Sequence, residues 1–217
     1  LVGSEMCIRD RELIDDAFAD VVELVSDQMA WAIAYKEDEQ VFTGDGTHIT
    51  GFLSTSGINS KDLDGTYLDP DDISLAIATL EENGARRDDL VLVVHPRTLH
   101  YLRTLKDSNN NYLFTELTAG NPILKTGAIG QIMGVPVYTT DVLPSATETT
   151  GNGDLTCTDA LMFDRRRAAI FVQRKGIEIE KDKDYDYDVI NLYATERIGF
   201  KVIYPDLVYH FDKVKNE

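Results

Sequence analysis

The segment from Asp182 to Asp188 (DKDYDYD) has the residue pattern most suggestive of metal chemistry in this sequence. Alternating carboxylates open a calcium-binding loop, but such a loop also needs a Gly at its sixth position and a Glu at its twelfth. Neither residue is present, whether positions are counted from Asp182 or from Asp184. If the segment is a strand, its four aspartates share one face. We therefore expect a solvated edge strand or a strand between subunits.

Other chemical motifs are incomplete. The segment GDGT (44–47) lacks the third Gly of a dinucleotide fingerprint, and KTGAIGQIMG (125–134) lacks the Gly-Lys-Ser/Thr of a phosphate-binding loop. No Ser stands in a nucleophile elbow. The histidines have no metal-ligand spacing: His48, His95, His100 and His210. We expect His95, just before Pro96, to act as a structural cap. The sequence thus predicts no catalytic, cofactor-binding or metal-binding residue.

Composition excludes several function classes. The 217 residues include 38 acidic and 21 basic side chains, a formal net charge of −17, which argues against a nucleic-acid clamp or a protein docked on anionic lipid. A basic cluster, Arg165–Arg167 with Arg174 and Lys175, is too small for nucleic-acid affinity and is expected to pair with acidic neighbours. No apolar stretch approaches the length of a membrane span. Two cysteines exclude a disulfide scaffold and favour a reducing compartment.

The first eleven residues, LVGSEMCIRDR, are not a signal peptide, because no apolar core follows a basic start. They resemble the conceptual translation of a transposase-type sequencing adapter. Residues 1–11 are therefore predicted to be an adapter-derived, non-native segment, with a native N-terminal portion missing. Cys7 would then not be native. A natural N-terminal tail is the alternative.

The elements that position the remaining residues begin with a long amphipathic helix, expected from residue 12 to about residue 40. Its apolar residues recur every three or four positions: Ile14, Phe18, Val21, Val25, Met29 and Ile33. A rod of roughly 40 Å would lie across a domain or pack against a partner. A second helix is expected from the N-cap Asp69 to Gly84, and a third from Pro96.

Strands account for much of the remainder. The apolar run LVLVV (90–94) is typical of a buried central strand, and residues 134–138 indicate a turn into another. The polar segment 144–159 is expected to be a mobile surface loop. Strand-like patterns then recur at Ala160–Phe163, Ala168–Gln173, Ile177–Glu180, Val189–Thr195 and Gly199–Tyr204.

In this order the elements resemble the major capsid proteins of tailed phages that have the Hong Kong 97 fold. The resemblance runs from residue 12 to about residue 211. It is carried by the long helix ending in AIAYKEDEQVFTGDG, by LVLVVHP, by GQIMGVPVYTTDVLP and, most of all, by the pair Glu196-Arg197 followed by an apolar strand and Pro205.

The resemblance implies an α+β fold with a long spine helix and two subdomains. The peripheral subdomain would hold residues 12–64 and 164–199, and the axial subdomain residues 65–163 and 200–217. The chain would be a structural protein and not an enzyme.

It would assemble with itself, as pentamers and hexamers, into the icosahedral head of the virion in the host cytoplasm. Scaffold, protease and portal proteins are possible partners. The shell would enclose DNA without sequence-specific binding, and no membrane is involved.

Some relatives form a self-catalysed isopeptide bond, and the positions of its acceptor Asn and catalytic Glu are Asp188 and Thr195 here. The resemblance therefore implies no cross-linking through them.

Two alternatives remain open at this stage. An encapsulin-type nanocompartment shell shares the fold and encloses cargo enzymes rather than a genome. A small α/β enzyme or ligand-binding domain would instead show a well-formed pocket with convergent polar groups.

Overall fold

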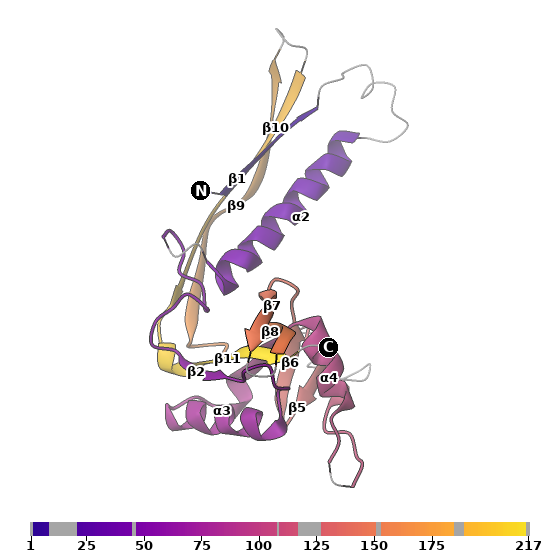
Figure 1. Ribbon diagram of the computed structural model, residues 1–217. Coiled ribbons are helices and arrows are strands. Elements are labelled where there is room, and N and C mark those ends of the chain that lie inside the picture. Colours follow the sequence, from indigo (N-terminus) through magenta and orange to yellow (C-terminus); the bar gives the residue numbers. More distant parts are fainter. Residues whose placement is uncertain are drawn as a thin grey trace.

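The computed structural model describes residues 2–8, 21–44, 47–107, 109–116, 127–150, 153–184 and 189–215. It consists of an elongated arm and a compact body (Figure 1). The arm contains a three-stranded sheet and one long helix, and the body contains an eight-stranded sheet and two shorter helices.

The arm's sheet has the order β1-β10-β9, with antiparallel neighbours. Its strands are β1 (Val2–Ile8), β9 (Ala169–Asp184) and β10 (Val189–Val202). Helix α2 (Val21–Phe42) runs alongside this sheet (Figure 1). The register of β9 against β10 shifts on either side of Arg197, which marks a bulge.

The body's sheet has the order β2-β11-β8-β3-β6-β5-β4, and β7 pairs with β8. Strand β3 (Leu90–Val94) lies in its middle and is buried along its whole length, as the continuous apolar run predicted. The other strands are β2 (Asn59–Asp62), β4 (Thr115–Glu116), β5 (Gly130–Ile132), β6 (Val135–Thr139), β7 (Ser145–Thr150), β8 (Gly153–Asp164) and β11 (Val208–Lys215).

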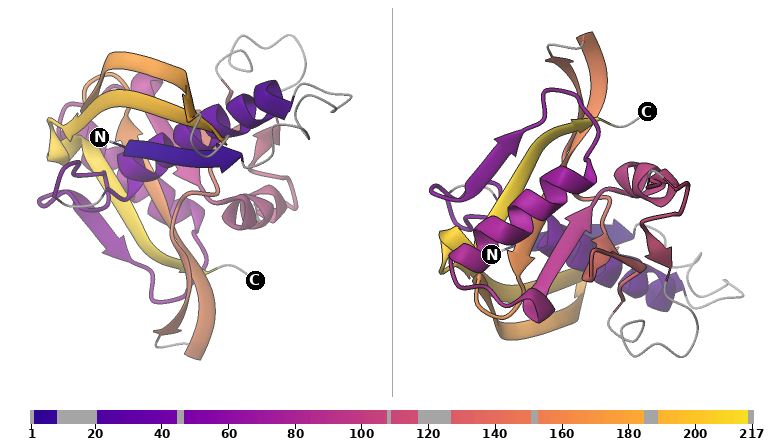
Figure 2. Two further views of the ribbon diagram at one scale, coloured as in Figure 1. Left: turned by 90° about the horizontal axis from the view of Figure 1, so that it is seen from above. Right: turned by 90° about the horizontal axis from the view of Figure 1, so that it is seen from below.

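Two helices cover this sheet, and both begin as their sequences predicted. Helix α3 (Pro70–Glu82) has Asp69 as its N-cap, ends just before Gly84, and lies across β11 (Figure 2). Helix α4 (Pro96–Thr104) follows β3 directly. Its N-cap is His95, whose Nδ1 accepts a hydrogen bond from the backbone N–H of Arg97 at 3.2 Å. The expected structural role of His95 is therefore confirmed.

The prediction of a mobile surface loop at 144–159 is wrong. Strands β7 and β8 form an antiparallel hairpin there, with Ser145 opposite Thr158 and Thr150 opposite Gly153. The polarity of the segment suggested a loop, but its many threonines are β-branched and favour extended backbone. Pairing with β8, which continues into the body's sheet, therefore outweighed the polarity of the segment and made it a strand.

Several other expectations fall partly outside the described residues. Of the long helix expected over residues 12–40, the structure describes the part from Val21 and extends it to Phe42. Residues 12–20 and 185–188 are not described, so DKDYDYD is seen only as the end of β9. Residues 2–8 form β1 against β10. The adapter origin of residues 1–11 stays a prediction.

An aromatic cluster joins arm and body. The ring of Phe52 lies 4.6 Å from that of Phe163 in β8 and 5.1 Å from that of Phe200 in β10, with Phe42 of α2 at 6.3 Å. The chain reaches this position by folding back on the end of α2. The backbone there is so close that a Cβ on Gly51 would lie 2.6 Å from the carbonyl carbon of Thr43.

Replacing Phe52 by Ala is expected to lower the free energy of unfolding by about 3–5 kcal/mol, because a nearly fully buried ring is removed from three aromatic neighbours. Urea denaturation followed by circular dichroism measures this. The matched control is Phe171→Ala, since Phe171 is 48% exposed; it should cost less than about 1 kcal/mol. Equal losses for both variants would contradict a structural role for the cluster.

Candidate functional site

Helix α2 is held to the arm by a single row of side chains. Val25, Met29 and Ile33 are buried and pack with Leu192 and Ala194 of β10. Because these helix residues are four apart, they lie along one narrow stripe. The buried apolar cluster between helix and sheet consists of these five residues, so the described part of the arm has little apolar core of its own.

Large apolar side chains are exposed on the outward part of this helix. Trp31 is 70% exposed and Leu24 56% exposed. Trp31 and Tyr35, one turn apart, stack with ring centroids 5.7 Å apart. On β9 three consecutive residues are also about half exposed: Ile170, Phe171 and Val172. Large exposed apolar side chains such as these are typical of protein–protein contact sites.

The row Val25-Met29-Ile33 continues into a pair of carboxyl groups. Glu37, one turn beyond Ile33, faces Glu196 of β10, which is 4% exposed. The side-chain amide of Gln173 donates a hydrogen bond to Oε1 of Glu196 at 2.7 Å. Atom Oε1 of Glu37 is buried without a hydrogen-bond partner. A pocket of about 780 Å³ opens beside the pair, lined by Gln40, His48, Arg174, Arg197 and others.

Burial, together with the Glu196 carboxyl and the charge of Asp38, raises the pKa of Glu37 from 4.5 to about 7. Below that pH Glu37 holds a proton and can share it with Glu196. Above it two carboxylates face each other in a poorly solvated place.

Part of the basic cluster pairs with acidic neighbours, as expected. Arg166 lies 2.9 Å from Asp89, and Arg167 lies 3.2 Å from Asp164. Asp164 is almost fully buried and also accepts the backbone N–H groups of Arg166 and Arg167. These arginines therefore hold the turn that leads from the body into β9.

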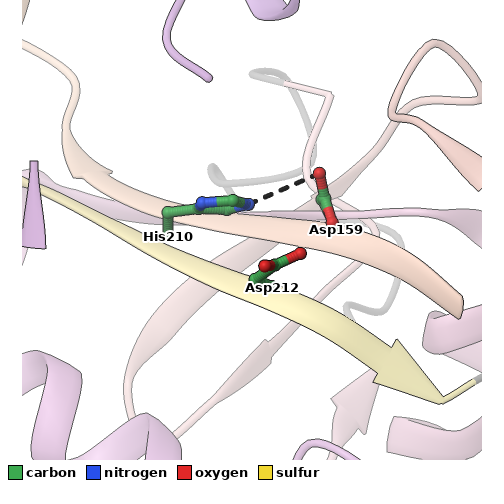
Figure 3. Close-up of side chains that lie close together, drawn as sticks. All are labelled: Asp159, His210 and Asp212. Atoms are coloured by element: carbon green, nitrogen blue, oxygen red, sulfur yellow. Dashed lines mark ion pairs between the residues drawn. The ribbon is translucent and has the colours of Figure 1, made fainter. Parts of the chain in front are cut away.

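Two groups of residues were missed by sequence reasoning. Glu37 continues the four-residue spacing of the apolar row, and that spacing was a signal that its carboxyl would be buried. The second group joins His210 to Asp159, whose Oδ2 lies 3.4 Å from the His210 Nε2 (Figure 3). No local spacing predicts it, because the two residues come from different strands.

Of the two positions considered for an isopeptide bond, Thr195 lies in β10 and Asp188 is outside the described residues.

Within the described part of the chain, no helix is both long and apolar enough to cross a membrane.

The architecture is the α+β fold of Hong Kong 97-type capsid proteins, and comparison with solved structures bears this out. The capsid of an empty GTA particle matches with a TM-score of 0.74 at 19% identity, covering 98% of this chain and 72% of that one. The SrpI encapsulin complex from Synechococcus elongatus matches with a TM-score of 0.69 at 13% identity, covering 99% and 73%.

Sequence comparison then gives the family. The model of the Phage capsid family matches residues 6–211, so the chain belongs to that family. Over 168 residues the chain is 28% identical to the major capsid protein of Enterobacteria phage HK97. The aligned region is 76% of this chain, which spans 40% of that relative. The resemblance inferred from the order of motifs is confirmed.

Replacing Glu37 by Gln is expected to flatten the pH dependence of thermal stability. The folded-state pKa of Glu37 is raised from 4.5 to about 7. Its favourable contact is therefore fully present below pH 4.5 and is lost as the pH rises through about 7. The melting temperature of the wild type should fall more steeply between pH 5 and pH 8 than that of the variant, whose amide stays neutral.

The matched control for this experiment is Glu39→Gln on the same helix, which removes an ion pair with Lys36 and leaves the Glu37–Glu196 contact in place. This control should keep the wild-type slope. Indistinguishable slopes for wild type and Glu37→Gln would show that the carboxyl pair does not titrate in this range.

Proposed function

We propose that this chain is a subunit of a phage head shell, assembling with copies of itself as pentamers and hexamers into an icosahedral container for the genome. The observation that carries the proposal is the construction of the arm. A 22-residue helix is held by one row of buried residues, while Trp31, Tyr35 and Leu24 face outward. Such an arm gains stability when neighbouring subunits cover it. Membership of the Phage capsid family supports the same role.

The two sheets support the proposed division into subdomains. We assign the arm to the peripheral subdomain (12–64 and 164–199) and the body to the axial subdomain (65–163 and 200–217). The sheets favour two small changes to the boundaries between these subdomains. Strand β2 pairs with β11 and belongs with the body, and β10 continues to Val202 within the arm.

The wider setting follows from this role. The protein would be part of the virion and would assemble in the cytoplasm of the bacterial host, with scaffold, protease and portal proteins as further partners. A net charge of −17 suits a container that encloses DNA without gripping it. The role is structural, so no catalysis is required of the carboxyl pair.

A second candidate is an encapsulin-type shell, favoured by the fold match to the SrpI encapsulin complex. The family and the curated relative favour the phage. Neighbouring genes separate the two. Portal, terminase and protease genes would indicate a phage head, whereas a peroxidase or ferritin-like gene would indicate a cargo compartment.

The proposal is tested by expressing this chain, and the full reading frame that contains it, and searching for closed shells by electron microscopy. Shells of uniform diameter are expected from the full reading frame. Soluble monomers alone, with and without the phage's own scaffold and protease, would overturn the proposal.

Replacing Trp31 by Ser in the assembling protein is expected to lower the yield of shells at least several-fold, because an outward-facing contact is lost. Its melting temperature before assembly should change by no more than about 3 °C, since the side chain is 70% exposed. Size-exclusion chromatography and electron microscopy give the yield. The control is Gln28→Ser, an exposed polar position on the same helix, which should assemble normally. Equal yields from both variants would contradict a contact at Trp31.

A further inference from the structure

Three side chains with metal-binding groups meet on one face of the body's sheet. They are Asp159 of β8 and His210 and Asp212 of β11 (Figure 3). His210 and Asp212 are two residues apart on one strand, so they share a face. Asp159 reaches the same face from the neighbouring strand.

A bulge in β11 brings the third ligand into place. The antiparallel pairing runs regularly to Phe211 opposite Ala160 and resumes with Val214 opposite Thr158. Two residues of β11, Asp212 and Lys213, therefore stand opposite the single residue Asp159, which defines a bulge. Lys213 takes a backbone φ of +53°, unusual for a residue with a side chain.

The spacing of the donor atoms fits one ion. One ligand atom from each residue lies within 4.8 Å of the other two, and His210 Nε2 lies 3.4 Å from Asp159 Oδ2. Ligands about 2.0–2.2 Å from a zinc ion are separated from one another by about 3–4 Å. Small rotations of the side chains would therefore close the group around a cation.

The imidazole provides an independent sign that a partner belongs here. The Nε2 atom of His210 is buried and makes no hydrogen bond, although it is aimed at the two carboxyl groups (Figure 3). A buried nitrogen without a hydrogen bond is costly to keep, and metal coordination would satisfy it.

Apart from His210, the two carboxyl groups have no cationic ion-pair partner among the described residues. Asp159 is 18% exposed, and among the described residues neither it nor Asp212 forms an ion pair with a Lys or Arg. The ammonium group of Lys213, the residue after Asp212, is bound to Asp62 at 2.9 Å.

We propose that Asp159, His210 and Asp212 form a binding site for one divalent transition-metal cation, which ties β8 to β11. One imidazole and two carboxylates suit zinc better than calcium, which takes oxygen ligands alone. Three protein ligands leave a coordination position for water. The site does not depend on the proposed shell function, because all three ligands come from one subunit.

The test is isothermal titration of the tag-free 217-residue chain with zinc chloride near pH 7.5, after treatment with EDTA and dialysis. One zinc per chain should bind at this site, and the melting temperature should rise with zinc concentration. Asp212→Asn should weaken that binding at least tenfold and abolish the thermal shift. Asp159→Asn should do the same, and it provides a second variant if the first does not fold by circular dichroism.

The matched control is Asp62→Asn, which removes a nearby carboxylate that is not a proposed ligand and should bind zinc like the wild type. Three results would overturn the site: no saturable binding by the wild type, equal affinity of the wild type and both ligand variants, or equal weakening by Asp62→Asn. Shell formation is not measured here, so failure of this site leaves the proposed function untouched.

Discussion

The narrow contact between α2 and the arm's sheet is the constraint on which the rest of this structure depends. Val25, Met29 and Ile33 contribute one row of buried side chains from a 22-residue helix. The buried apolar cluster between this helix and its sheet has only five residues, which contributes little hydrophobic stabilisation. The arm must therefore be held from elsewhere: by its junction with the body and, under the proposed function, by other copies of the chain.

Aromatic packing at the junction holds the arm to the body. Phe52 brings together Phe42 and Phe200 of the arm and Phe163 of the body. The turn at residues 165–167 reinforces this junction. Asp164 accepts hydrogen bonds from the backbone N–H groups of Arg166 and Arg167 and forms an ion pair with the Arg167 side chain. The body behind this junction has a continuous core around β3. The body thus carries an arm with exposed apolar side chains, which under the proposed function would contact neighbouring subunits.

Polar groups lie where the apolar row of α2 ends and where the pairing of β8 with β11 is interrupted. Glu37 and Glu196 face each other where the apolar row of α2 ends, so the protonation state of Glu37 affects how firmly the helix is held. Asp159, His210 and Asp212 lie at the bulge where pairing between β8 and β11 is interrupted. In both places a proton or a cation would offset charge that the fold has partly removed from water.

Much of this was determined by the sequence itself. Asp69-Pro70 and His95-Pro96 mark helix starts by local capping, LVLVV is typical of a buried strand, and the four-residue spacing of α2 selects its buried side. These features depend on neighbours in the chain. The hairpin of β7 and β8 was missed because pairing outweighed polarity.

The two carboxyl clusters and the Phe52 junction join residues far apart in sequence, such as Glu37 with Glu196 and Asp159 with His210. Local propensity and spacing contain no information on such pairs. Only the tertiary structure, which sets strand order, register and the bulge, decided that they meet.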